Sequence, residues 1–163
     1  MDKVAIYPGS FDPMTLGHLN IIRRASKIFD KVVVCIMVNG TKDRAMFSPE
    51  RRVEMARLVT AHLPNVEIDY YSGLLAEYAK RFDKPVIVKG LRASMDFENE
   101  FTMASINKKL NPEMETMFLM ASDKYTFVSS SNVKEIARHG GDLRDFLPWE
   151  LIDEVMEMAR KEK

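Results

Sequence analysis

The sequence PGSFDPMTLGH, residues 8–18, joins an expected strand to an expected helix. The apolar run Val4–Tyr7 before it has the composition of a buried strand, and the apolar residues after it recur at helical spacing. Gly9 and Gly17 lie within this loop, and a glycine-containing turn at such a junction can direct backbone N–H groups toward an anion. We therefore predict an anion-binding site here. His18 falls in the first turn of the expected helix, where its side chain can reach the same anion.

This loop differs from two familiar phosphate loops. It lacks the Gly-Lys-Ser/Thr ending of a P-loop, and it does not contain the pattern G-x-G-x-x-G. Residues 15–18 match T-x-G-H, and in this they resemble the signature of the nucleotidyltransferase superfamily. The alternative is a purely structural role, in which Gly9 and Gly17 shape a tight turn and His18 caps the helix.

Short apolar runs alternate with helical patterns along the rest of the chain. The expected strands are Val4–Tyr7, Val32–Val38, Val66–Tyr70, Val86–Val88 and Thr116–Met120. The expected helices are, approximately, Leu16–Phe29, Pro49–Leu63, Leu74–Arg81, Phe97–Leu110, Ser131–His139 and a terminal helix from Pro148. This alternation predicts a single α/β domain, residues 1–163, with a Rossmann-like parallel five-stranded sheet and helices on both faces.

Cations and hydroxyls follow several of the expected strands. Ligands of such folds bind beyond the carboxyl ends of the strands, which here lead to Lys42, to Lys89 and Arg92, and to the run Ser129–Ser131. Arg and Lys bind phosphate oxygens, and the serines open a helix whose first N–H groups can bind an anion. Solvated or ion-paired cations and a simple helix N-cap are the structural alternatives.

Composition restricts the remaining possibilities. The net charge of +0 gives no reason to expect binding to nucleic acid or to a membrane surface, and the apolar runs are too short to span a bilayer. Because the first expected strand starts at Val4, we expect no signal peptide and a cytoplasmic protein. The single cysteine, Cys35, lies in an apolar run and is expected to be a buried thiol without a disulfide partner.

The candidate residues are cations and neutral donors, without an obvious protein nucleophile. The sequence shows no Ser/His/Asp arrangement, no metal-spaced Cys/His cluster and no paired carboxylates. This inventory favours phosphoryl or nucleotidyl transfer, in which catalysis consists mainly of positioning and charge stabilisation.

Several segments, in order along essentially the whole chain, resemble the bacterial phosphopantetheine adenylyltransferases. They are Tyr7–Pro13, Thr15–His18, Lys89–Arg92, Asp96–Glu98 with Glu100, Phe127–Ser131 with Lys134-Glu135, and Ala137–His139 with Gly141-Asp142. The resemblance implies the nucleotidyltransferase fold and transfer of the adenylyl group of ATP to 4′-phosphopantetheine, which yields dephospho-coenzyme A and pyrophosphate. The phosphate of the substrate would itself be the nucleophile.

The same resemblance implies roles for individual residues. His18, Lys42 and Arg92 would stabilise the transition state, and phosphopantetheine would be held by Ser10, Lys42, Leu75 and Lys89. The ATP site would be lined by Ser10, Phe11, His18, Gly90, Leu91, Arg92, Glu100, Tyr125, Thr126, Phe127, Val128, Ser129, Ser130 and Ser131. Mg²⁺ would accompany the nucleotide, bound largely by phosphates and water, so no protein ligand to the metal is expected. A homohexamer and feedback inhibition by coenzyme A are also implied.

Three departures from the family pattern and three rival functions accompany this interpretation. One departure is a loop around residues 43–45 that is slightly longer than in some members, which bears on the placement of Lys42. Position 89 is Lys where many members have Arg, and Asn99 stands where Tyr is common. A nicotinamide mononucleotide adenylyltransferase would share residues 15–18, but segments 89–92 and 96–100 favour the first reading. A non-catalytic nucleotide sensor would not need His18 beside these cations, and the missing dinucleotide fingerprint disfavours a nicotinamide-dependent oxidoreductase.

Overall fold

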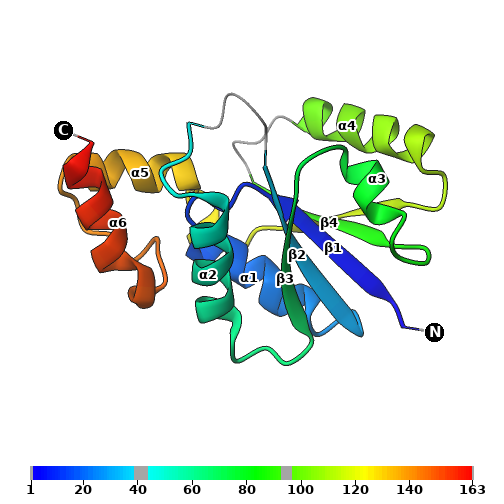
Figure 1. Cartoon of the computed structure of the whole chain (residues 1–163), viewed down its shortest axis with the longest axis horizontal. Helices are drawn as coiled ribbons and strands as arrows, with labels where there is room; N and C mark the ends of the chain where they lie inside the picture. The colour runs from blue at the N-terminus through cyan, green and yellow to red at the C-terminus, as the bar shows by residue number, and fades with distance from the viewer. Residues whose placement is uncertain (1, 39–43, 93–96, 163) are drawn as a thin grey trace.

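The computed structural model of the chain describes residues 2–38, 44–92 and 97–162. Five strands form one sheet in the order β3-β2-β1-β4-β5, and all neighbouring strands are parallel (Figure 1). The strands are β1 Val4–Gly9, β2 Lys31–Met37, β3 Val66–Tyr71, β4 Val86–Leu91 and β5 Glu115–Met120. The predicted parallel sheet of five strands is therefore confirmed. The direction of the strand order reverses between β1 and β4, so the carboxyl ends of these two strands flank the switch point at which ligands of such sheets bind.

The helices lie close to their predicted positions. They are α1 Leu16–Ala25, α2 Pro49–Thr60, α3 Leu75–Ala79, α4 Phe97–Leu110, α5 Ser130–Arg138 and α6 Trp149–Lys161, with a 3₁₀ turn at Asp123–Tyr125. The predicted extension of α1 to Phe29 is wrong. Its last residues form a separate turn, which the Asn65 side-chain amide holds by donating to the carbonyl oxygens of Ser26 (2.8 Å) and Phe29 (3.1 Å).

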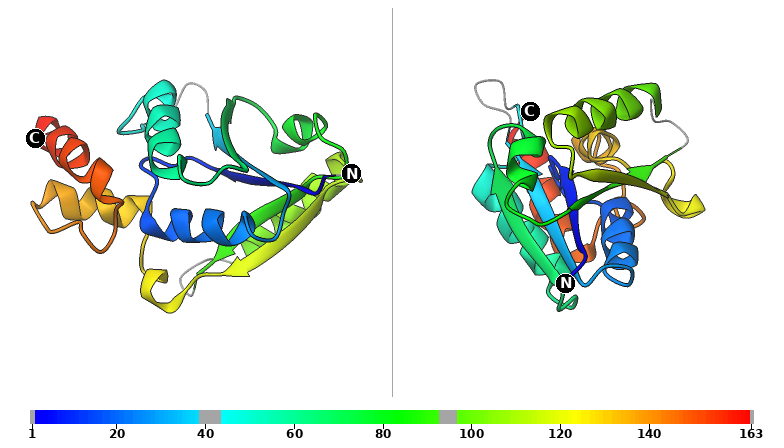
Figure 2. Two further views of the ribbon diagram at one scale, coloured as in Figure 1. Left: turned by 90° about the horizontal axis from the view of Figure 1, so that it is seen from below. Right: turned by 90° about the vertical axis from the view of Figure 1, so that its right-hand side faces the viewer.

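The side chains of β1 and of β2 alternate between two different hydrophobic clusters. On β1, Ala5 and Tyr7 belong to a large cluster with α1 and α2, whereas Ile6 belongs to a smaller cluster with α3. On β2, Cys35 also belongs to the smaller cluster and is buried, as predicted. We call the side covered by α1 and α2 the packed face and the opposite side the open face. The right-hand view of Figure 2 shows α1 and α4 on opposite sides of β4 and β5.

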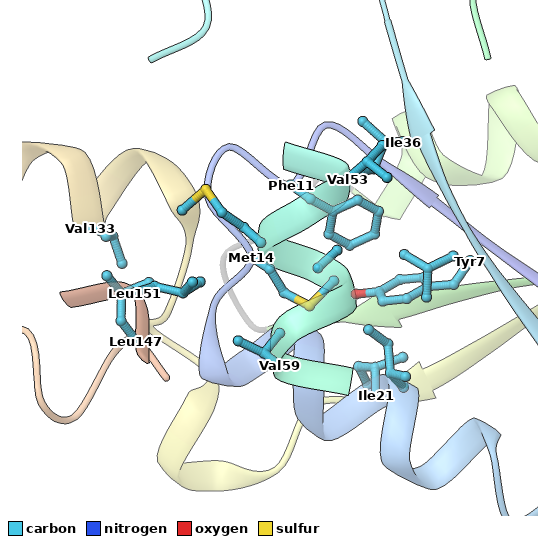
Figure 3. Packing of buried hydrophobic residues seen from close by; sticks show 14 of the residues in the cluster. Tyr7, Phe11, Met14, Ile21, Ile36, Val53, Val59, Val133, Leu147 and Leu151 are labelled. Carbon is cyan, nitrogen blue, oxygen red and sulfur yellow. The ribbon is translucent and has the colours of Figure 1, made fainter. Parts of the chain in front are cut away.

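Helices α5 and α6 continue the core of the packed face beyond the end of the sheet. Val133 and Leu151 belong to the same buried cluster as Phe11 and Met14 of the β1–α1 loop. Figure 3 shows Met14 between the sheet residues and the side chains of α5 and α6. The loop at residues 8–15 is thus held between the sheet and the carboxyl-terminal helices.

Helix α4 packs quite differently from α1 and α2. None of its 14 residues, all of which the structure describes, is buried. Its large apolar side chains remain exposed, namely Phe97, Phe101, Met103, Ile106 and Leu110. The open face therefore carries an apolar helix that contributes little to the core of the single chain.

Candidate active site

A cavity of about 220 Å³, the first cavity, opens where the strand order reverses. The loop after β1 contributes one wall and the end of β4 contributes another, while Tyr125 and Val128 close the side toward α5. Its lining residues are Tyr7, Pro8, Gly9, Ser10, Phe11, Gly17, His18, Ile21, Lys89, Gly90, Arg92, Glu100, Ala121, Tyr125 and Val128. The site thus lies where a doubly wound sheet places its ligand.

The buried carboxylate of Asp12 anchors the β1–α1 loop. It accepts hydrogen bonds from the backbone N–H groups of Met46 (2.8 Å) and Phe47 (2.9 Å) and from Lys134 Nζ of α5 (2.9 Å). Only 3% of Asp12 is exposed, and such a buried charge is tolerated because three donors surround it. The loop is thereby tied to α5 and to the segment before α2.

Two further hydrogen bonds restrain the same loop. Arg52 Nη1 of α2 donates to the Ser10 carbonyl oxygen (3.0 Å), and the Ser130 hydroxyl of α5 donates to the Pro13 carbonyl oxygen (2.7 Å). Between these anchors, Phe11 adopts a left-handed backbone conformation with φ of 46°. This conformation is costly for a non-glycine residue, and the surrounding contacts stabilise it.

The imidazole of His18 is held in one orientation by Thr15, the residue that caps α1. The Thr15 backbone N–H donates to His18 Nδ1 (3.0 Å), and the His18 backbone N–H donates to the Thr15 hydroxyl (3.3 Å). The Phe11 ring contacts the imidazole edge-on, with 4.9 Å between ring centroids. Because Nδ1 accepts a hydrogen bond, a neutral His18 carries its proton on Nε2. His18 lines the first cavity, so the geometry provides a neutral N–H donor there.

Burial, reinforced by the positive charges of Arg92 and Lys89, lowers the pKa of His18 to about 3. The imidazole is therefore neutral at physiological pH in the free protein. A donor of this kind can bind an oxyanion without first being protonated.

Two cations at the end of β4 complete the electrostatics of the site. Arg92 Nη1 donates to the Val128 carbonyl oxygen (2.8 Å), which ties the guanidinium to the segment before α5. Lys89 Nζ lies 3.7 Å from Glu100 Oε2 of α4, and both side chains are partly buried. Arg92 and Lys89 thus supply positive charge to a wall of the cavity that His18 also lines.

A second cavity, of about 410 Å³, adjoins the first on the open face. It includes Leu75 of α3, Ile87 of β4 and Met103 of α4 in its lining, which is mainly apolar away from the first cavity. The two cavities share Pro8, Gly9, Lys89 and Glu100. The ion pair of Lys89 and Glu100 therefore lies at the junction of a polar cavity and a more apolar one.

The structure brings most of the predicted site residues together. Of those assigned to ATP, Ser10, Phe11, His18, Gly90, Arg92, Glu100, Tyr125 and Val128 line the first cavity. Leu75 and Lys89, assigned to phosphopantetheine, line the second. Lys42 lies outside the described residues. Leu91, Thr126, Phe127, Ser129, Ser130 and Ser131 do not line the first cavity, and Phe127 is 75% exposed, so their ligand contacts stay predictions.

The three serines at the start of α5 do not act as equivalents. The Ser129 hydroxyl accepts from the backbone N–H of Asn132 (3.1 Å) and so caps the helix. The Ser130 hydroxyl is bonded to Pro13, whereas Ser131 is exposed. Helix capping and loop anchoring thus account for two of the three hydroxyls, and one of these contacts joins residues that are 117 positions apart.

Sequence reasoning missed several residues that line the cavities. Tyr7 and Ile21 of the first cavity lie in patterns that were assigned to a strand and a helix, and apolar periodicity does not distinguish a cavity wall from a core. Met103 and Asn107 of α4 line the second cavity. Leu74, which also lines it, follows an expected strand end, and that position was the available signal.

The described residues contain neither a group of side chains suited to a metal ion nor a helix suited to a membrane. No three of their His, Cys, Asp and Glu side chains are grouped closely enough to hold a metal ion. Within residues 2–38, 44–92 and 97–162, no helix is both long enough and apolar enough to cross a membrane.

Comparison with solved structures agrees with the fold. A structure described as a nicotinate-nucleotide adenylyltransferase from Vibrio parahaemolyticus superimposes with a TM-score of 0.65. The match covers 99% of this chain and 94% of that one, at 19% sequence identity. At this identity the likeness shows a shared fold and nothing finer.

Comparison with known families and sequences is more specific. The family model described as Cytidylyltransferase-like matches residues 6–136. The phosphopantetheine adenylyltransferase of Caldanaerobacter subterraneus is 53% identical over 159 residues, which cover 98% of this chain and 99% of that protein. The enzyme of the same name from Desulforudis audaxviator is 53% identical over 146 residues, which cover 90% and 89% of the two chains. With the T-x-G-H loop at the switch point of the sheet, these matches show that the chain belongs to the phosphopantetheine adenylyltransferase family.

Proposed function

We propose that the protein transfers the adenylyl group of ATP to 4′-phosphopantetheine, producing dephospho-coenzyme A and pyrophosphate. The observation that carries this proposal is the pair of adjoining cavities, which meet at Lys89 and Glu100. A polar cavity lined by His18 and Arg92 suits the nucleotide phosphates, and a more apolar one suits the pantetheine arm. Family membership supports the same reaction.

The reaction requires no nucleophile from the protein. A phosphate oxygen of phosphopantetheine forms a bond to the α-phosphorus of ATP, and the bond from that phosphorus to the bridging oxygen of the β-phosphate breaks. Pyrophosphate leaves with the bonding electrons. His18 Nε2–H and the Arg92 guanidinium are placed to stabilise the negative charge on the transferring phosphorus centre, which is the main catalytic task in such transfers. Lys42 is assigned to the same task by the family resemblance.

Lys89 is placed to position the acceptor substrate. Its ammonium group lies at the junction of the two cavities, where the phosphate of phosphopantetheine would have to approach the nucleotide. The pantetheine arm would then extend past Leu75 and Met103. Two phosphate groups held at adjacent positions resemble the transition state more closely than the free reactants do, and this proximity is a large part of the rate gain.

We expect Mg²⁺ to bind together with the nucleotide and not at a dedicated metal site of the protein. The only carboxylate lining the first cavity, among the described residues, is that of Glu100, which is paired with Lys89. Mg²⁺ would therefore be held mainly by phosphate oxygens and water. When bound, it would neutralise part of the negative charge on the triphosphate and on the departing pyrophosphate.

Self-association, with a hexamer as the expected state, and inhibition by coenzyme A belong to the same proposal. The exposed apolar side chains of α4 offer a surface that a second copy of the chain can bury. Coenzyme A contains the pantetheine arm and would occupy the second cavity. A cytoplasmic location would suit these substrates.

The experiment is an assay with ATP, Mg²⁺ and 4′-phosphopantetheine, in which mass spectrometry detects dephospho-coenzyme A. Nicotinamide mononucleotide in place of phosphopantetheine provides the control for a related adenylyltransferase. Product from phosphopantetheine alone is expected. Product only from the control substrate would overturn the assignment. Light scattering of the same preparation should show an oligomer, and a monomer at micromolar concentration would contradict self-association.

A further inference from the structure

We propose that the hydroxyl of Tyr7 is an additional phosphate-binding donor of the first cavity, directed at the phosphate group that His18 and Arg92 hold. The proposal rests on the proposed function for the identity of the ligand. Tyr7 lies on β1, immediately before the glycine-containing loop, and lines the first cavity with His18, Gly90 and Arg92.

The first observation is that the Tyr7 hydroxyl opens into the first cavity without a hydrogen-bond partner in the described part of the chain. Only 6% of the residue is exposed, but its hydroxyl oxygen is not one of the fully buried polar atoms, and Tyr7 lines the cavity. Buried tyrosine hydroxyls usually find a partner. Tyr78, the other deeply buried tyrosine of the described chain, follows that rule, because its hydroxyl donates to Asp69 Oδ2 at 2.8 Å.

The second observation concerns what surrounds Tyr7. Its ring packs edge-on against Phe11, with 5.3 Å between ring centroids, and lies 6.3 Å from the His18 ring. A Cβ at Gly90 would lie 4.0 Å from the Tyr7 hydroxyl, so the hydroxyl lies close to Gly90 near the end of β4. Gly90 also lines the first cavity, and the packing of the ring against Phe11 restrains the hydroxyl there.

The phenol of Tyr7 is neutral and therefore carries a proton that it can donate. Burial raises the pKa of Tyr7 well above its ordinary value, and the nearby positive charge of Arg92 opposes this only in part. The phenol is therefore protonated at physiological pH. The same Coulombic effect of Arg92 also acts on His18, so the guanidinium lies near both side chains.

These features point to an anion as the missing partner. A neutral O–H next to a fixed guanidinium forms its strongest hydrogen bond with an acceptor that the guanidinium also attracts. A phosphate has several oxygens and can accept from Tyr7, His18 and Arg92 together. The nucleotide is the ligand concerned, because Tyr7 lines the first cavity and does not line the second.

The test is Tyr7→Phe, which keeps the ring and its packing and removes the hydroxyl alone. The dissociation constant of ATP, measured by calorimetric titration, should rise about tenfold, and kcat/KM for ATP should fall by a similar factor. The midpoint of thermal unfolding of the free protein should stay nearly equal, because the hydroxyl has no hydrogen bond to a described residue that the variant would lose. KM for phosphopantetheine should change little.

Tyr78→Phe is the matched control. It removes a buried hydroxyl that has a protein partner and lies outside both cavities, so it should lower the unfolding midpoint and leave kcat/KM for ATP unchanged.

Unchanged ATP affinity and unchanged kcat/KM in Tyr7→Phe would overturn the proposal. A lower unfolding midpoint with normal ATP binding would also overturn it, because the hydroxyl would then serve only the free protein. If the parent protein binds ATP but forms no dephospho-coenzyme A, the proposed function is wrong. The ATP titrations of the parent and of Tyr7→Phe still test the role of Tyr7 in that case.

Discussion

The two faces of the sheet are built from the same alternating strands yet differ in how completely they are covered. On the packed face, α1 buries Ile22 and Ala25 completely, and α2 and the carboxyl-terminal helices extend the same cluster. On the open face, α3 is short, α4 buries none of its described residues, and the second cavity lies between α4 and the sheet. The difference indicates that the two faces have different roles. The packed face contains most of the hydrophobic core of the single chain, whereas the open face contains the second cavity.

The candidate active site lies where these two regions meet. His18 projects from α1 of the packed face, whereas Glu100 belongs to α4 of the open face. Substitutions on the two sides should therefore separate stability from binding, and four tests examine this division.

His18→Ala should have the largest effect, and the effect should be on turnover. Removing one donor aimed at developing charge typically costs 10²–10³ in kcat, or about 3–4 kcal/mol. The affinity for ATP should change much less, because the interaction strengthens as charge grows in the transition state. Steady-state kinetics together with an ATP titration provide the measurement. Near-normal turnover would remove His18 from the mechanism.

Ile22→Ala and Met103→Ala form a matched pair across the two faces. Ile22 is 0% exposed on α1, so its truncation should lower the free energy of unfolding by about 3 kcal/mol. Met103 is 47% exposed on α4 and lines the second cavity, so its truncation should cost less than about 0.5 kcal/mol. Met103→Ala should instead raise KM for phosphopantetheine several-fold. Urea denaturation and kinetics of both variants test the contrast, and equal losses of stability would refute it.

Lys89→Ala should weaken the binding of phosphopantetheine by roughly ten- to hundredfold. The estimate follows from the loss of one charge-assisted hydrogen bond, about 1.5–3 kcal/mol. ATP affinity should fall less, although Lys89 borders both cavities. Calorimetric titration of each ligand separates the two effects. Lys89→Arg, which restores the residue common in the family, should retain binding. An equal loss for both ligands would assign Lys89 to the nucleotide as much as to the acceptor.

The pH dependence of stability provides the smallest of the four tests. The pKa of His18 is about 3 in the folded protein and near 6.5 when unfolded, so the unfolded chain binds an extra proton between these values. Stability is therefore lost as the pH falls below 6.5, by about 2 kcal/mol at pH 5. His18→Gln removes this contribution and should lose about 2 kcal/mol less than the parent between pH 7 and pH 5. Parallel stability curves for parent and variant would show that His18 titrates normally in the fold.

Local patterns in the sequence were sufficient for much of the architecture. The spacing of apolar residues predicted every strand and every helix of four residues or more, because period-2 and helical patterns are properties of neighbouring residues. The serines at 129–131 and Gly140 marked the two ends of α5 for the same local reason, and the structure identifies Ser129 as the N-cap and gives Gly140 a φ of 73°. The order of the motif residues along the chain was also enough to predict the family.

Only the tertiary structure decided which residues share an environment. The Lys134–Asp12 contact spans 122 positions, and no local pattern predicts such a pairing. The sequence pattern does not distinguish Tyr7 from a core residue of a strand. The fold places it in the wall of a cavity, because the ends of β1 and β4 lie side by side. The apolar pattern of α4 likewise predicted a helix but not the face it would cover or how exposed it would remain. Periodicity determines whether a segment forms a helix or a strand. The residues that the segment contacts depend on chain crossings and packing, which are encoded over the whole sequence.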